Sequence, residues 1–209
     1  MQFRCQPADP LGLSCEALQW RAWPWTMPGV RIALFGGSFD PPHWGHVLAA
    51  AYAFSAGMVD QVWVMPVDRH AYGKPLSAWD QRWALCEAAF AGLGFVRLRD
   101  DERRNPGGYT VDLVDALREA DPGNEWFLVG GTDTARDMVN WHRGSELTRM
   151  VGVIAVPRRG YDQHPAALPE ISSTRVRELC AAGEPIDGLV PPRVAARIRA
   201  ERWYAMPAG

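Results

Sequence analysis

Two histidines three positions apart, His43 and His46, are the first residues of this chain whose types and spacing could do chemistry. They stand at the expected start of a helix, so both side chains lie on the same side of its first turn. Gly36 and Gly37 precede them at the end of an apolar run, and residues without a Cβ let a ligand approach the main chain. The free N–H groups and the dipole of a helix start favour an anion. This stretch therefore predicts a site for the phosphates of a nucleotide.

The full order of residues from Gly36 to His46, Gly-Gly-Ser-Phe-Asp-Pro-Pro-His-Trp-Gly-His, makes this prediction specific. A glycine pair after a strand is usually only a turn. Two histidines at this spacing could bind a metal, but no third ligand stands at a supporting position. The stretch matches neither the Walker pattern G-x-x-x-x-G-K nor the Rossmann pattern G-x-G-x-x-G. Gly45, between the two histidines, removes a side chain that would crowd a phosphate.

A second stretch, Ile-Ser-Ser-Thr-Arg-Val-Arg from Ile171 to Arg177, has the features of another phosphate site. A serine at the start of a helix caps it, and the next N–H groups then face an anion. Thr174 and Arg177 are three apart on one face, so a hydroxyl and a guanidinium converge on the same phosphate. The planar fork of arginine binds two oxygens at once. Alone, this stretch would be a capped surface helix; with the first stretch, it predicts a second anchor for the nucleotide.

Apolar runs and helical stretches alternate along the chain and must position both sites. Strands are expected at residues 30–35, 61–65, 95–98, 126–129 and 151–156. Helices are expected at residues 44–56, 78–91, 110–120, 143–150, 173–181 and 192–200. This alternation predicts an α/β fold in which helices cover both faces of a parallel sheet. Right-handed crossovers then place the functional loops at the carboxyl ends of the strands.

The first 29 residues differ from the rest, with three tryptophans, four prolines and no clear periodicity. They are interpreted as an N-terminal extension of unknown role, and Met27 is an alternative natural start of the protein. Residues 30–209 are expected to form a single domain.

The composition excludes several classes of function. The chain has 209 residues, 47% of them hydrophobic and 22% charged, and a net charge of −2, so no basic patch for nucleic acid is expected. No run of 18 apolar residues predicts a membrane span. The four cysteines (Cys5, Cys15, Cys86 and Cys180) are far apart and form no C-x-x-C pair, which favours a reducing, cytoplasmic location. The sequence leaves open whether the chain forms a homo-oligomer.

The first stretch resembles the signature of the H-x-G-H nucleotidyltransferase superfamily, and within it the chain is similar to the bacterial nicotinate-mononucleotide adenylyltransferases. The second stretch resembles their I-S-S-T-x-I-R motif, with Val176 in place of isoleucine. The resemblance covers about residues 30–203. It implies a Rossmann-like, doubly wound parallel sheet of the nucleotidyltransferase type, with C-terminal helices.

The resemblance also implies a reaction and a set of site residues. The expected reaction transfers AMP from ATP to nicotinate mononucleotide and releases pyrophosphate, with Mg2+ arriving on ATP rather than on protein ligands. The expected catalytic residues are His43, His46 and Arg177. The expected ATP- and phosphate-binding residues are Gly36, Gly37, Ser38, Phe39, Ser172, Ser173, Thr174 and Lys74. The expected acceptor-binding residues are Tyr109, Thr110, Asp133 and Trp141.

The acceptor residues also make physical sense on their own. Tyr109 and Thr110 open a helix, where backbone N–H groups suit a carboxylate, and the family binds nicotinate at its matching Tyr-Thr. Gly-Thr-Asp, ending at Asp133, resembles the family's G-A-D, with Thr132 in place of alanine. Trp141 follows at the family's spacing, and its face against a pyridinium ring would contribute about 0.5–2 kcal/mol. The alternative for Trp141 is a core aromatic in a chain with ten tryptophans.

One region departs from the family pattern. Residues 66–74 replace the family's Pro-Pro-His-Lys run, so His70 and Lys74 could bind phosphate or could lie on an exposed loop. This leaves the acceptor's identity open. Nicotinamide mononucleotide is one alternative acceptor, since its carboxamide could use the same N–H groups as a carboxylate. Another phosphate as the acceptor and CTP as the donor are further alternatives. A non-catalytic nucleotide sensor is a more distant alternative, because a sensor does not need His43, His46 and Arg177 as donors to a transition state.

Overall fold

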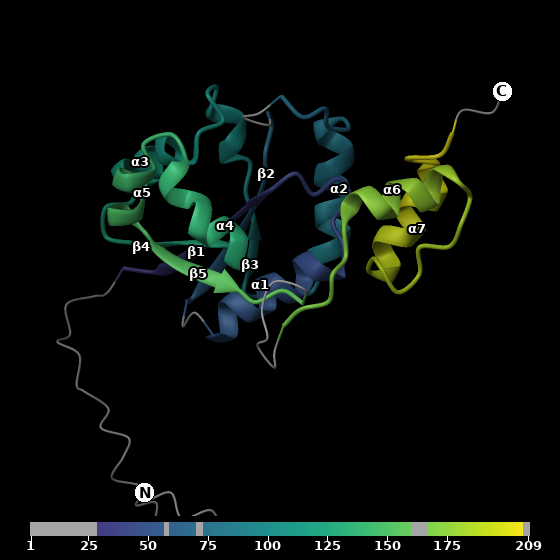
Figure 1. The fold of residues 1–209 in the computed structure, drawn as a ribbon, viewed down its shortest axis with the longest axis horizontal. Helices are drawn as coiled ribbons and strands as arrows, with labels where there is room; N and C mark the ends of the chain where they lie inside the picture. The colour runs from purple at the N-terminus through teal and green to yellow at the C-terminus, as the bar shows by residue number, and fades with distance from the viewer. Residues whose placement is uncertain (1–28, 57–58, 70–72, 160–166, 207–209) are drawn as a thin grey trace, which may run out of the picture.

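Five parallel strands form one sheet at the centre of the molecule (Figure 1). The computed structural model describes residues 29–56, 59–69, 73–159 and 167–206. The strands are β1 (Arg31–Gly37), β2 (Gln61–Pro66), β3 (Val96–Leu98), β4 (Glu125–Gly131) and β5 (Gly152–Val156). Their order across the sheet is β3-β2-β1-β4-β5, and every neighbouring pair is parallel.

The central strand β1 is buried on both faces because its side chains alternate between two hydrophobic cores. Ala33 and Phe35 point into one core, and Ile32 and Leu34 point into the other. This explains why β1 is a continuous apolar run in the sequence rather than an alternating one. Helices must therefore cover both faces of the sheet.

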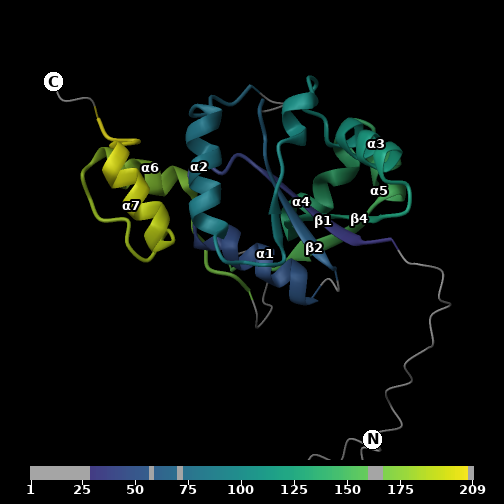
Figure 2. The same cartoon turned by 180° about the vertical axis from the view of Figure 1, so that it is seen from behind.

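Helices lie on both sides of the sheet (Figures 1 and 2); four of them contribute to one hydrophobic core and two to the other. The first group is α1 (Trp44–Ala56), α2 (Trp79–Phe90), α6 (Ser173–Ala181) and α7 (Pro192–Glu201). The second group is α3 (Thr110–Ala120) and α5 (Gly144–Met150). In both views α6 and α7 lie beside α2 at one end of the molecule, and α7 packs against α2. The predicted Rossmann-like, doubly wound sheet is confirmed.

Three short helical segments have no counterpart in the prediction: η1 (Asp101–Arg104), α4 (Thr132–Asp137) and η2 (Met138–Asn140). Each is too short to show a helical period in the sequence. The strands β1 and β4 run two residues further than predicted, because their terminal glycine pairs still pair with β2 and β5. The helix expected from residue 143 begins at Gly144, with Arg143 in a left-handed conformation before it.

The strand order reverses beside β1. The chain runs outward from β1 to β2 and β3 and then returns to place β4 on the other side of β1. In sheets of this kind, ligands bind outside the carboxyl ends of the strands at such a reversal. The carboxyl ends of β1 and β4, each with two glycines, are therefore the expected location of the site.

Some predictions lie outside the described residues. Residues 1–28, including Met27, and His70 are among them, so the extension and the alternative start stay predictions. Within the described parts of the chain, no helix combines the length and the apolar character needed to cross a membrane.

Candidate active site

Two cavities open where β1 and β4 end. The histidine cavity has a volume of about 310 Å³, and its lining includes His43, His46, Arg158 and Ser172. The tryptophan cavity has a volume of about 280 Å³, and its lining includes Trp141, Thr110, Glu102 and Ser38. The residues that line both cavities are Gly36, Val129, Gly130 and Thr134. The cavities therefore meet at the strand reversal and could hold the two halves of one dinucleotide.

The two histidines are stacked against each other in the histidine cavity. Their ring centroids are 3.8 Å apart, with the planes inclined by 29°. The backbone N–H of His43 donates to Nδ1 of His46 at 3.1 Å. Because Nδ1 of His46 accepts this bond, the proton of its neutral ring is on Nε2, which can donate to a ligand. Phe39 supports this arrangement, with its ring 4.8 Å from that of His46.

Both histidines are uncharged near pH 7 in the free protein. Burial and, to a smaller extent, the positive charge of Arg158 lower the pKa of His43 to about 4. Burial, His43 and Arg158 lower the pKa of His46 well below its usual value. Nδ1 of His43 is buried and has no hydrogen-bond partner among the described residues. A bound anion would oppose the field of Arg158 and make both rings more basic.

The second phosphate stretch is attached to the first. The side chain of Ser172 caps α6 by accepting from the backbone N–H of Arg175 at 3.2 Å. The Ser173 hydroxyl donates to the carbonyl oxygen of Pro41 at 2.8 Å. Arg177 donates to the carbonyl oxygen of Asp40 and, at 3.3 Å, to the hydroxyl of Thr174. The fold thus brings together two motifs that are more than 120 residues apart in the chain.

The turn between β1 and α1 is also held from two other directions. The carboxylate of Asp40 accepts from the hydroxyl of Tyr204 at 2.8 Å and from the backbone N–H of Ser77 at 3.0 Å. The guanidinium of Arg82, buried in α2, donates to the carbonyl oxygens of Ser38 and Ser77, each at 3.0 Å. Contacts from α2, α6 and the C-terminal segment therefore fix the chain that leads into His43.

The tryptophan cavity is bounded by the start of α3 and the segment before α5. Thr110, the first residue of α3, lines it, and so does Trp141, whose Nε1–H donates to Asp137 at 3.3 Å. Tyr109, just before α3, is 41% exposed, and its ring stacks on His142 with centroids 4.2 Å apart. The α3 start and Trp141 thus lie on the same cavity, as the acceptor prediction requires.

Some of the remaining predicted site residues line the tryptophan cavity, and the others lie outside the lining of both cavities. Gly37 and Ser38 do line the tryptophan cavity. Phe39 is only 1% exposed and belongs to the hydrophobic core, so its side chain supports His46 rather than facing a ligand. The other predicted residues outside the lining are Lys74, Tyr109, Asp133, Ser173, Thr174 and Arg177. Of these, Lys74, Tyr109, Asp133 and Thr174 are exposed.

Two charged residues in the cavities were missed by sequence reasoning. Arg158 follows β5 by two residues, and the strand-end rule that pointed to the glycine pairs could have found it. Glu102 lies in the unpredicted η1, is 7% exposed, and accepts from the side-chain amide of Asn105 at 3.1 Å. Burial raises the pKa of Glu102 to about 7. No local pattern in the sequence distinguishes Glu102 from the acidic residues beside it.

The described residues contain no group of three or more His, Cys, Asp or Glu side chains that could hold a metal ion. Cys86 and Cys180 are free thiols, and Cys5 and Cys15 lie outside the described residues.

Comparison with known proteins identifies the family. The model of cytidylyltransferase-like proteins matches residues 34–179. A relative in Myxococcus xanthus, named probable nicotinate-nucleotide adenylyltransferase, is 37% identical over 187 residues, which cover 86% of this chain and 97% of the relative. The chain belongs to the nicotinate-nucleotide adenylyltransferase family. A second relative of the same name, in Anaeromyxobacter dehalogenans, is 36% identical over 182 residues, which cover 84% of this chain and 97% of the relative.

Solved structures agree with this assignment at the level of the fold. The nicotinic acid mononucleotide adenylyltransferase of Plasmodium falciparum, in complex with NaAD, matches with a TM-score of 0.72 at 19% sequence identity, over 84% of this chain and 97% of that chain. The same enzyme in complex with APC matches with a TM-score of 0.70. As a member of the family, the chain is a nucleotidyltransferase, which confirms the predicted class of enzyme.

Proposed function

We propose that this chain transfers the adenylyl group of ATP to nicotinate mononucleotide, forming nicotinate adenine dinucleotide and pyrophosphate. The observation that carries the proposal is the meeting of the histidine cavity and the tryptophan cavity at Gly36. ATP would occupy the first cavity and the mononucleotide the second, so that the two phosphates face each other at the shared glycine. Gly36 has no side chain there to separate them.

In the proposed reaction, a phosphate oxygen of the mononucleotide attacks the α-phosphorus of ATP, and the bond to the bridging oxygen of pyrophosphate breaks. Such a displacement depends on positioning and on stabilising charge more than on a protein nucleophile. His43 and His46 would donate to the oxygens of the transferring phosphorus. Arg158 would add positive charge to the same cavity, where it already lowers the pKa of both histidines.

The second motif would hold the β- and γ-phosphates. Ser172 lines the histidine cavity, and the start of α6 directs its backbone N–H groups and positive dipole end toward an anion. Arg177 is positioned by Asp40 and Thr174. A guanidinium has five N–H donors, and these two contacts do not exhaust them. Arg177 could therefore bind phosphate while keeping its link to the first motif.

Mg2+ is expected to arrive on the triphosphate. The ion usually keeps several waters and binds through substrate phosphates, which suits a site with no protein metal cluster in the described part of the chain. When bound, it would neutralise charge on the leaving pyrophosphate.

On the acceptor side, Thr110 and the α3 start would bind the nicotinate carboxylate, and Trp141 would stack on the pyridinium ring.

The proposed function is tested by measuring pyrophosphate release from ATP and Mg2+, with nicotinate and nicotinamide mononucleotides compared side by side. A further arm of the experiment replaces ATP with CTP. A strong preference for ATP with the acid supports the proposal. Equal turnover of the amide, or turnover only with CTP, would contradict the assignment of substrates. ATP binding without pyrophosphate release would instead point to a nucleotide sensor.

A further inference from the structure

Arg143 has an unusual backbone conformation beside the tryptophan cavity. Its φ is 50° in the left-handed region, at the N-cap of α5. A residue with a Cβ is uncommon there, and such strain often marks a functional position. Arg143 directly follows Trp141 and His142 in the chain, so its conformation sets the direction in which that segment leaves the cavity.

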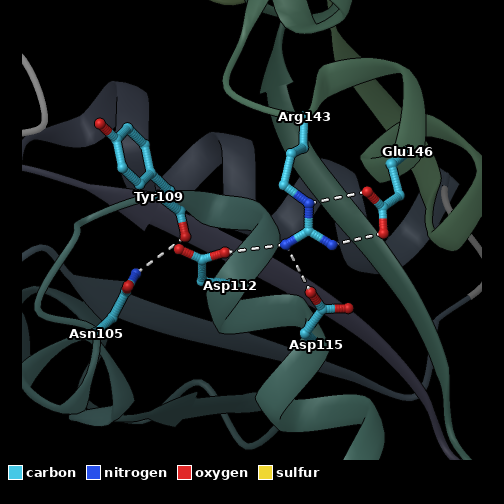
Figure 3. Close-up of polar contacts among 6 residues, drawn as sticks. All are labelled: Asn105, Tyr109, Asp112, Asp115, Arg143 and Glu146. Carbon is cyan, nitrogen blue, oxygen red and sulfur yellow. Dashed lines mark hydrogen bonds and ion pairs between the residues drawn. The ribbon is translucent and has the colours of Figure 1, made fainter.

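The side chain of Arg143 joins three carboxylates (Figure 3). Nη1 donates to Asp112 at 3.1 Å and to Asp115 at 3.0 Å, both on α3. Nε donates to one oxygen of Glu146 at 2.8 Å, and Nη2 donates to the other. Exposed ion pairs are individually weak, but one planar fork that engages several carboxylates is a more favourable geometry. Arg143 therefore ties the first turns of α3 to the start of α5.

The two segments that Arg143 joins both contribute lining residues to the tryptophan cavity: Gly108 and Thr110 at the start of α3 belong to one wall, and Trp141 before α5 belongs to the other. Just before α3 begins, Asn105 donates its side-chain amide to the carbonyl oxygen of Tyr109 at 3.1 Å (Figure 3). On the other wall, Trp141 lines the cavity, and the next residue, His142, stacks on the Tyr109 ring. Arg143 is the side chain that links the Trp141 segment to α3 through ion pairs.

We propose that Arg143 is a positioning residue for the acceptor: it holds Trp141 and His142 against the start of α3 and so fixes the distance between the two walls of the tryptophan cavity. This inference rests on the proposed function, in which that cavity binds the mononucleotide. Arg143 lines neither cavity. Its loss would therefore loosen acceptor binding and leave the ATP side as it is.

The test uses Arg143→Gly, because glycine adopts the left-handed conformation without strain, so the ion pairs are removed without forcing the backbone into another conformation. We expect the KM for nicotinate mononucleotide to rise about 10-fold, with the KM for ATP and kcat within about twofold of wild type, as for a loss of uniform binding. Arg202→Gly is the matched control. Arg202 is also a left-handed, exposed arginine, at the end of α7, and lines neither cavity. This control should leave the KM for nicotinate mononucleotide unchanged.

Salt provides a second readout that a purely structural role would not move. The side chains of Arg143 and its partners are 37–48% exposed, so their attraction is screened by salt. Raising the salt from about 0.05 M to about 0.5 M should reduce the difference in acceptor KM between wild type and Arg143→Gly. Equal increases in both KM values, or an unchanged acceptor KM, would overturn the inference.

Hydrogen exchange separates this inference from the proposed function. The amides of residues 138–147 should exchange faster in Arg143→Gly than in wild type, and not in Arg202→Gly, whatever the acceptor is. Unchanged exchange in that segment contradicts the positioning role even if the enzyme is active. A wild-type protein that releases no pyrophosphate with nicotinate mononucleotide contradicts only the proposed function, because the exchange result stands without it.

Discussion

His43 and His46 would meet ATP as neutral rings, and this sets what each can contribute. Their pKa values are lowered by burial and by Arg158, so neither brings a full positive charge to the free site at pH 7. Each contributes one N–H, and for His46 it is on Nε2 because Nδ1 is already an acceptor. Positive charge would develop on these rings as negative charge arrives, which favours a transition state over an empty site.

Removal of one such donor should slow the reaction strongly. His46→Ala is expected to lower kcat by about 10²–10³-fold, because a donor to the transferring phosphorus is lost, while the KM for ATP changes little. The measurement is the steady-state rate of pyrophosphate release, with thermal unfolding to show that the variant is folded. Full turnover by a folded His46→Ala protein would remove His46 from the proposed mechanism.

Glu102 should make stability fall as pH rises from about 4.5 through about 7. Burial raises its pKa from 4.5 to about 7, so the folded protein keeps a proton there that the unfolded chain has lost. The unfolded state then binds fewer protons, so stability falls as pH rises through 7. His43 and His46 have the opposite shift, so their contribution to stability rises with pH and is complete only about a unit above their usual value of 6.5. The difference between wild type and Glu102→Gln therefore isolates Glu102, because both proteins carry the same histidines.

The check is chemical denaturation of wild type and Glu102→Gln between pH 6.5 and about pH 8. Wild type is expected to lose stability relative to Glu102→Gln across this range, because glutamine does not ionise. The variant keeps an oxygen that can accept from Asn105. Identical slopes in the two proteins would show that Glu102 is already ionised at pH 6.5.

Three helices contribute anion-binding backbone N–H groups at their N-terminal ends. The beginnings of α1, α3 and α6 all lie at the carboxyl edge of the sheet, so their N–H groups and dipoles act on one region. In α1, the absence of a side chain at Gly45 leaves room for the ring of His43. A Cβ at Gly45 would lie 2.9 Å from both Cε1 and Nδ1 of that ring. Glycine at this position therefore lowers the helix propensity of α1 but allows the observed orientation of the His43 ring.

Gly45→Ala separates these two effects. Alanine in a helix is more favourable than glycine by about 1 kcal/mol, so the melting temperature should not fall far. The kcat should nevertheless fall about 10-fold or more, because the added methyl group displaces the His43 ring from its stack on His46. Gly94→Ala, where a Cβ would have nothing within 4 Å, is the control for a glycine-to-alanine change. Wild-type kcat in Gly45→Ala would mean that the His43 ring does not need its present position.

Sequence reasoning predicted the elements better than the contacts between them. All five strands and the six longer helices were predicted, because each has a hydrophobic pattern long enough to show its period. The stacking of His43 on His46 and the cap at Ser172 were predictable because they are local. Arg158 and Glu102 were missed because their place in the cavities depends on the packing of distant elements. The attachment of Arg177 to Asp40 is non-local in the same way.

At the scale of the whole molecule, the C-terminal segment is part of the site's support. The hydroxyl of Tyr204 donates to Asp40 across 164 positions of the chain. Burial and the nearby Asp40 raise the pKa of Tyr204, so the hydroxyl keeps its proton at any assay pH. Asp40 in turn belongs to the turn that leads into His43. The last helix and its tail thus help to fix the first phosphate-binding stretch.

Tyr204→Phe removes only this hydroxyl. We expect a loss of about 1–3 kcal/mol in the free energy of unfolding, since the bond is to a carboxylate, and a fall in kcat of about 3–10-fold as the turn loosens. Denaturation and pyrophosphate release measure the two effects. Tyr52→Phe, at a tyrosine of α1 outside both cavities, is the matched control. A variant with normal kcat would show that Ser77 and Arg177 hold the turn without Tyr204.

The bond between Tyr204 and Asp40 also has a consequence for how the protein is made. Chains emerge from the ribosome with the N-terminal part first, so the His43 turn is synthesised long before its last anchor. A message with a stop codon just before position 204 would yield a nearly complete chain that lacks this anchor.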